Sequence, residues 1–135
     1  MKLFIDSNII LDFLDQTRTA HNDAQKIVRY LIMNDIETYL SEDMLTTIYY
    51  ISKNKTKALE FFETVLQIWK SVSFGQSLIF AAIAISKDGE DFEDVLQCLT
   101  AKDNGCSVLI TNDQKFYNCG INVMSAAEYI QSTES

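Results

Sequence analysis

Carboxylates stand at four separate places in this chain, each at the end of a predicted strand or the start of a predicted helix. The acids are Asp6 in FIDSN, Glu42 and Asp43 in YLSEDM, Asp91 and Asp94 in DFEDVLQ, and Asp113 in LITNDQKF. Three of the groups follow apolar runs typical of buried strands (KLFI, ETYL and SVLI), and the fourth opens an amphipathic helix. The carboxyl ends of parallel strands share one edge of a sheet, where ligands bind. The sequence therefore predicts that these acids meet in one pocket.

A site made of carboxylates, without histidine or cysteine, favours hard cations such as Mg²⁺ or Mn²⁺. Two such ions, about 4 Å apart, activate water and stabilise the leaving oxygen in phosphodiester cleavage. His21 is the only histidine, and its polar surroundings (TRTAHND) predict a surface position. The pattern thus indicates metal-assisted hydrolysis and argues against a histidine triad or a zinc site.

Each acid also has an ordinary structural explanation. Asp6 and Asp91 stand where a helix N-cap is expected, and Asn-Asp at Asp113 is common turn chemistry. Asp94 lies three residues after Asp91 and shares its helix face, whereas Glu93 is expected to point elsewhere. Only the joint placement of the acids favours a functional site.

The elements that must position these acids alternate along the chain. Strands are expected at 2–5, 37–40, 71–74, 107–110 and 121–124, and helices at 8–14, 20–33, 42–53, 58–69, 75–87, 92–105 and 126–131. Ser41 is a plausible N-cap, Gly105 a C-terminal residue, and Ser125 with Glu128 a capping box. KNKTK reads as a basic turn between helices. This alternation predicts an α/β fold with a mainly parallel sheet.

Length and composition predict one soluble domain. The 135 residues are 47% hydrophobic and 22% charged, which is typical of a globular protein with a real core. No apolar run reaches the roughly 18 residues needed to span a bilayer, and SLIFAAIAIS is expected to be a buried helix. The N-terminus lacks the pattern of a secretion signal. We therefore expect a cytoplasmic protein without membrane association.

Charge and cysteine content narrow the function further. Cys98, Cys106 and Cys119 are odd in number and form no C-x-x-C pair, so all three are expected to be structural thiols. The net charge of −8 argues mildly against a non-catalytic nucleic-acid binder, because such binding depends on lysine and arginine. A metal-dependent enzyme can still be acidic, since its bound cations meet the phosphate.

The order of these motifs resembles the PIN-domain nuclease family over nearly the whole chain. Its most specific part is DFEDVLQ followed by T-N-D-x-x-F, and V-M-S-x-x-E-Y is similar to the family's last strand and helix. The resemblance implies a single PIN domain over 1–135, with a three-layer α/β/α Rossmann-like fold and a mainly parallel central sheet. It also implies an endoribonuclease dependent on Mg²⁺ or Mn²⁺. Bacterial members of this size are often VapC-like toxins of type II toxin–antitoxin pairs, so RNA, a cognate antitoxin and a homodimer held by the early helices are the implied partners.

The resemblance assigns roles residue by residue. Asp6, Asp94 and Asp113 match three family acids that hold the metal, Asp91 is an additional carboxylate beside them, and Ser7 or Asn8 would be a polar partner near the metal. RNA contacts are expected from Lys53, Lys55, Lys57 and Lys115, although a solvated basic turn explains the first three equally well.

One position departs from the family pattern. The family's second acid, a glutamate on the helix after the second strand, is replaced by Thr47. Asp43 lies four residues earlier on the same helical face, and Glu42 is its neighbour. Our hypothesis is that Asp43, or failing that Glu42, supplies the missing charge as a catalytic acid. The alternative is a weakened or inactive module that binds RNA or a protein partner.

Other α/β domains with acidic sites fit less well. A receiver domain would have paired acids after the first strand and a late lysine. A haloacid-type phosphatase would have a second aspartate two places after Asp6, where this chain has Asn8.

Overall fold

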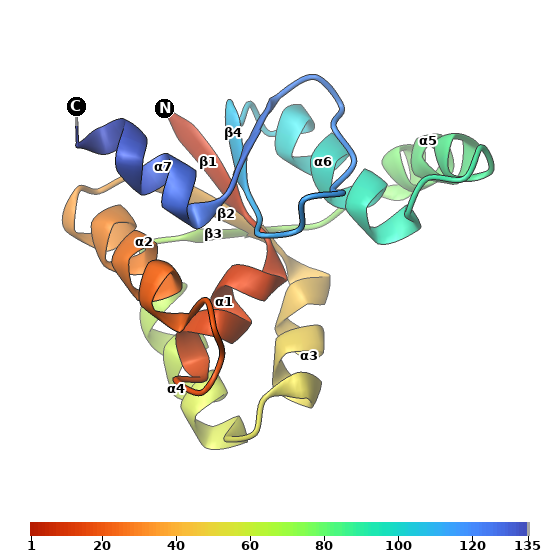
Figure 1. The fold of residues 1–135 in the computed structure, drawn as a ribbon. Helices are drawn as coiled ribbons and strands as arrows, with labels where there is room; N and C mark the ends of the chain where they lie inside the picture. The colour runs from red at the N-terminus through yellow and green to blue at the C-terminus, as the bar shows by residue number, and fades with distance from the viewer. Residues whose placement is uncertain (135) are drawn as a thin grey trace.

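The computed structural model describes residues 1–134, which form a five-stranded parallel sheet and seven helices (Figure 1). The strands are β1 (Lys2–Ile5), β2 (Glu37–Ser41), β3 (Lys70–Val72), β4 (Val108–Ile110) and β5 (Asn122–Met124). The helices are α1 (Ser7–Leu14), α2 (His21–Met33), α3 (Glu42–Ile51), α4 (Lys55–Val65), α5 (Gln76–Ser86), α6 (Phe92–Asp103) and α7 (Ala126–Thr133). The predicted α/β/α class with a parallel sheet is confirmed.

The strand order β3-β2-β1-β4-β5 creates a switch point beside β1. The chain builds outward from β1 to β3 and then crosses to the other side for β4 and β5. Ile5 pairs with Ile110 at the carboxyl ends of β1 and β4, and the Asp6 amide donates to the Ile110 carbonyl at 2.9 Å. The residues that follow these two strands therefore leave the sheet side by side, in the place where α/β sheets bind ligands.

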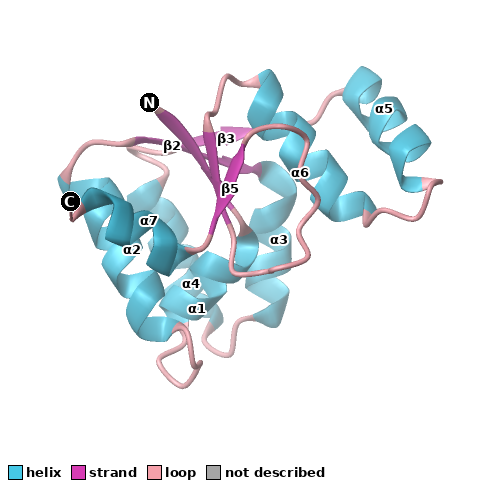
Figure 2. Cartoon of the chain, turned by 45° about the horizontal axis from the view of Figure 1, so that its top comes forward, coloured by secondary structure: helices cyan, strands magenta, loops and turns pink. Residues whose placement is uncertain are grey.

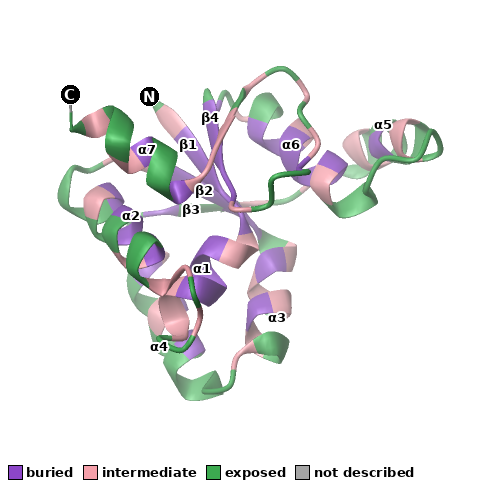
Figure 3. Cartoon of the chain, viewed as in Figure 1, coloured by how far each residue is buried: buried purple, intermediate pink, exposed green. Residues whose placement is uncertain are grey.

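Helices cover the sheet on both faces. Figures 1 and 2 show α1, α2 and α7 together on one side and α6 on the other, with α5 projecting outward beside α6. Leu3, Phe4 and Ile5 of the central strand are completely buried, as expected for a parallel strand covered on both faces. Figure 3 shows the same burial along β1, β2 and β4.

The predicted basic turn at KNKTK is partly wrong. Helix α4 begins at Lys55 rather than at Ala58, because Asn54 caps it by accepting from the Lys57 amide at 3.0 Å. In this helix Leu59 is 52% exposed, whereas Phe62 packs into the core.

Helix α5 is not the buried helix that its apolar sequence predicts. Helix α5 packs mainly against α6. Ala82 is therefore its one buried residue, and Phe80 is 63% exposed. Among residues 1–134, no helix has both the length and the apolar character needed to cross a membrane.

The helix ends follow local chemistry in most cases. Asp91 and Ser125 cap α6 and α7, and Ser125 forms the predicted capping box with Glu128. Gly105 follows the end of α6 with φ of 78°, a left-handed conformation that glycine adopts without steric cost. Ser41 precedes α3, but its side chain makes no capping hydrogen bond, contrary to the prediction.

The prediction of three structural thiols holds only for Cys106, which is buried and free. Cys98 of α6 and Cys119 of the β4–β5 connection form a disulfide, with their Cα atoms 6.0 Å apart. The sequence spacing of 21 residues hides this pair, because only the folded β4–β5 connection brings Cys119 beside α6. The bond ties the helix of Asp94 to the segment that begins with Asp113.

We expect reduction to destabilise the oxidised protein. A crosslink that closes a loop of this length lowers the entropy of the unfolded chain and so stabilises the folded state by about 3 kcal/mol. This free energy corresponds to a change in Tm of roughly 10 °C. Calorimetry with and without a reductant such as dithiothreitol measures the change. The Cys98→Ala/Cys119→Ala variant is the control, and its Tm should not respond to reductant. Equal Tm values for oxidised and reduced wild type would contradict the prediction.

Candidate functional site

Asp6 is the anchor of the acidic edge. It follows β1 directly and is only 7% exposed. Its Oδ1 accepts a hydrogen bond from the Ser7 backbone amide at 2.7 Å. Asp6 is therefore also the N-cap of α1, the structural role that the sequence predicted for it. Its Oδ2 accepts from the Thr111 hydroxyl at 2.7 Å and from the Asn8 amide at 3.2 Å. The residues that follow β1 (Ser7 and Asn8) and the residue that follows β4 (Thr111) therefore hold the carboxylate in a single orientation.

Thr111, which directly follows β4, belongs to the site, although the sequence did not predict a role for it. Its hydroxyl donates to Asp6 and accepts from the Asn8 amide at 3.1 Å and from the Asp113 backbone amide at 3.1 Å. Thr111 is 3% exposed, so this network is shielded from water. The position of the residue within T-N-D, directly after a buried strand, is the sequence signal for this role.

Asp94 lies within electrostatic range of several other acids. Burial raises the pKa of Asp94 to about 7, with further contributions from the charges of Asp91, Asp6 and Asp113. Burial likewise raises the pKa of Asp6, against the hydrogen bonds from Thr111 and Ser7, and the charge of Asp113 adds to the increase. The structure therefore brings the acids after β1, after β4 and at the start of α6 within electrostatic range of one another.

The expectation that Glu93 points away from the other acids is wrong, because the charges of Asp6, Asp43 and Asp91 act on its carboxylate. Burial raises the pKa of Glu93, followed by the charges of Asp6, Asp43 and Asp91. The residue as a whole lies at the surface, but its carboxylate is partly desolvated by its neighbours. Gln97 donates to Glu93 Oε1 at 3.3 Å. A glutamate four residues before a buried glutamine is the pattern that would have revealed this orientation.

The acids after β2 differ in their positions. Asp43 acts on Glu93, and its Oδ1 is buried without a hydrogen-bond partner among the described residues. Glu42 is exposed and is not among the charges that raise the pKa of Glu93. The Thr47 hydroxyl donates to the Asp43 carbonyl at 3.3 Å, within its own helix. Of the two acids proposed as substitutes, Asp43 has the environment that a substitute needs.

The donor set suits a hard divalent cation. All its charged members are carboxylates, their charges help to raise the pKa of Asp94 and of Glu93, and Asp43 offers a buried oxygen without a partner among the described residues. Within residues 1–134, no three acidic, histidine or cysteine side chains already surround one point closely enough for a ready-made metal site. Mg²⁺ commonly binds one or two carboxylates and completes its shell with water and substrate phosphate. Asp6, Asp94, Asp113 and Asp43 are the residues that would hold such an ion, with Asp91 and Glu93 beside them.

Three of the four predicted RNA-binding lysines make local structural contacts. Lys55 donates to the carbonyls of Tyr49, Tyr50 and Ser52 at the end of α3, at 3.1 to 3.3 Å. Lys57 donates to the Leu14 carbonyl at 3.1 Å. Such contacts satisfy helix C-termini and favour a cation there.

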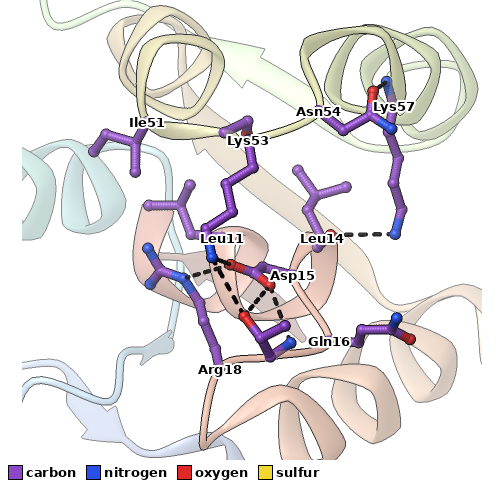
Figure 4. Close-up of a pocket in the computed structure, with 11 residues that line it drawn as sticks. Leu11, Leu14, Asp15, Gln16, Arg18, Ile51, Lys53, Asn54 and Lys57 are labelled. Carbon is purple, nitrogen blue, oxygen red and sulfur yellow. Dashed lines mark hydrogen bonds and ion pairs between the residues drawn. The ribbon is translucent and has the colours of Figure 1, made fainter.

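Lys53 lies in a pocket that is separate from the acids after β1 and β4. Lys53 forms an ion pair with Asp15 at 3.4 Å, and hydrogen bonds from Thr17 lower the pKa of Asp15 to about 2. Figure 4 shows Lys53 and Asp15 in this pocket of about 300 Å³, which lies between α1, α3 and α4 and has Leu11 and Ile51 among its lining residues. None of the acids after β1 or β4 lines it. The pocket is therefore a separate surface.

Comparisons with known proteins identify the family of this chain. The PIN-domain family model matches residues 2–115. The chain belongs to the PIN-domain family. Ribonuclease VapC1 of Aquifex aeolicus is 35% identical to it over 135 residues, covering 96% of this chain and 94% of that protein. The resemblance stated from the motifs is confirmed.

Solved structures show the same fold at low sequence identity. VapC20 of Mycobacterium tuberculosis, described as a sarcin–ricin-loop-cleaving toxin, has a TM-score of 0.69 and 12% identity, covering 88% of this PIN domain and 95% of that chain. VapBC2 of Rickettsia felis, solved with promoter DNA, has a TM-score of 0.68 and 17% identity, covering 93% and 98%. A toxin–antitoxin complex from Klebsiella pneumoniae has a TM-score of 0.68 and 15% identity, covering 92% and 97%. The PIN fold therefore extends over nearly the whole chain.

The raised pKa of Asp94 predicts a stability that falls with pH in the absence of metal. An aspartate in the unfolded chain ionises near pH 4, whereas burial and neighbouring acids keep Asp94 protonated in the folded PIN domain up to about pH 7. The folded state binds more protons between these values, so the free energy of unfolding decreases as pH rises through this window. We expect Asp94→Asn to raise Tm at pH 8 in EDTA by a few degrees, with no gain at pH 4.

Asp88→Asn is the matched control, because it removes the same charge from an exposed loop before α6. Thermal scans of the three proteins from pH 4 to 8 make the comparison. Equal gains for Asp94→Asn and Asp88→Asn at pH 8 would show that net charge alone, and not crowding at the acidic edge, causes the effect.

Proposed function

We propose that this PIN-domain protein is an endoribonuclease that depends on Mg²⁺ or Mn²⁺, hydrolyses RNA phosphodiester bonds and acts as the toxin of a type II toxin–antitoxin pair. The observation that carries the proposal is the convergence of Asp6, Asp94 and Asp113 at the switch point of the sheet. The 35% identity to Ribonuclease VapC1 supports the choice of RNA.

The chain's own residues prepare the site for this chemistry. Thr111, Ser7 and Asn8 hold the Asp6 carboxylate in one orientation, so little reorganisation is needed when substrate binds. Asp94, with its pKa near 7, can hold or release a proton at neutral pH. When bound, the cation supplies charge that activates water and stabilises the leaving oxygen.

A quiet PIN module that binds RNA or a protein is the second candidate. The observation that favours it is Thr47, whose hydroxyl bonds inside α3 and brings no charge to the acidic edge. Under our first proposal, Asp43 compensates for this loss through its unpartnered carboxylate oxygen.

The partners of the toxin proposal have separate surfaces on the molecule. The pocket between α1, α3 and α4 combines apolar residues with Arg18, Lys53 and Lys57, which suits an acidic, partly apolar antitoxin segment. For a homodimer, the exposed apolar side chains of α5, including Phe80, offer an alternative to the early helices. RNA would approach through Lys115, which is exposed and two residues from Asp113.

A ribonuclease assay tests the activity. Wild type should cleave RNA with added Mn²⁺ and lose cleavage in EDTA. Asp6→Asn should lower the rate by at least about 100-fold, because it removes a charge at the centre of the site. Asp88→Asn serves as the control and should cleave like wild type. Cleavage that persists in EDTA, or in Asp6→Asn, would exclude the proposed mechanism. No cleavage with any metal would favour the quiet module.

Metal binding should stabilise the protein most at higher pH. The cation relieves repulsion among the acids and stabilises the folded state by mass action. It also competes with the proton on Asp94, whose pKa is raised to about 7. We expect millimolar Mn²⁺ to raise Tm by several degrees at pH 8 and by much less at pH 5, as measured by differential scanning fluorimetry. A shift that is equal at both pH values, or absent at both, would count against the site.

A further inference from the structure

We propose that Glu93, held by a hydrogen bond from Gln97, supplies a further carboxylate to the metal site and, together with Asp43, replaces the family glutamate that is Thr47 in this chain. The inference rests on the proposed metal-dependent function and adds a residue to it. It extends the hypothesis of compensation within α3, because the additional charge comes from a different helix, α6.

The direction of the Glu93 side chain follows from its hydrogen bond. Gln97 is 1% exposed and lies on the face of α6 that packs toward the sheet. Glu93 is one helical turn earlier on the same face, and its Oε1 accepts from Gln97 Nε2 at 3.3 Å. Although Glu93 as a whole is exposed, this bond holds its carboxylate against the buried amide of Gln97 on the face of α6 that packs toward the sheet.

Neighbouring buried oxygens leave this part of the site incomplete. Among the described residues, Gln97 Oε1, Asp43 Oδ1 and Ser41 Oγ are buried without a hydrogen-bond partner. They belong to α6 and to the junction of β2 with α3, and α6 packs against β2. Unpaired buried polar atoms cost free energy, and their retention in a native protein calls for a reason such as an ion or water. A hydrated cation beside Glu93 and Asp43 would satisfy them.

The electrostatic neighbours of Glu93 are the members of the proposed site. The charges that act on it belong to Asp6, Asp43 and Asp91. Glu93 therefore lies within electrostatic range of both the acid after β1 and the acid after β2.

Mn²⁺ binding without RNA tests the inference directly. We expect Glu93→Gln to weaken Mn²⁺ binding by at least about tenfold in isothermal titration calorimetry. Glu60→Gln is the matched control, because it neutralises an exposed glutamate of α4, and it should bind Mn²⁺ like wild type. Gln97→Leu should weaken binding less than Glu93→Gln, since it removes the orienting hydrogen bond and keeps the carboxylate.

The outcomes separate this inference from the proposed function. Equal Mn²⁺ affinity for wild type, Glu93→Gln and Glu60→Gln would overturn the inference, even if wild type cleaves RNA. Wild type that binds no Mn²⁺ overturns it as well. Wild type that binds Mn²⁺ with the expected loss in Glu93→Gln, but cleaves no RNA, would support the role of Glu93 and reject the ribonuclease. Circular dichroism of each variant establishes that it is folded.

Discussion

Repulsion among carboxylates at one edge of the sheet is the constraint on which the rest of this structure depends. Asp6 and Asp94 lie where burial and neighbouring acids oppose their ionisation. Packing alone does not favour such an arrangement, because like charges in a partly dehydrated site destabilise the folded state. The protein holds them there with specific contacts, chiefly the short hydrogen bond from Thr111 to Asp6. Under the proposed function, a bound cation would relieve this repulsion.

The elements around the acidic edge limit its relaxation. Pairing of β1 with β4 places Asp6 beside Thr111. The Asp91 cap fixes the first turn of α6, and the disulfide between Cys98 and Cys119 ties that helix to the β4–β5 connection. These contacts limit how far the backbone segments that carry the acids can move apart. This rigidity favours a site that is prepared for charge, in agreement with the electrostatic view of catalysis.

Positive charge in this acidic protein is used sparingly. Lys55 and Lys57 bind carbonyls at the ends of α3 and α1, and Lys53 pairs with Asp15. These lysines connect the helices around the pocket of Figure 4, away from the acids. Under the proposed function, phosphate recognition at the acidic edge therefore depends more on bound cations than on lysine side chains. This division is consistent with a net charge of −8.

The sequence by itself determined the parallel α/β fold, the strand-end acids and the family, because these depend on local apolar runs, caps and motif order. The tertiary structure alone decided which acids face one another. Glu93 was expected to point away, yet it accepts a hydrogen bond from the buried Gln97 and lies within electrostatic range of Asp6 and Asp43. The Cys98–Cys119 pair and the exposure of α5 were also invisible in the sequence. Such features depend on contacts between elements far apart in the chain, which local periodicity and spacing do not encode.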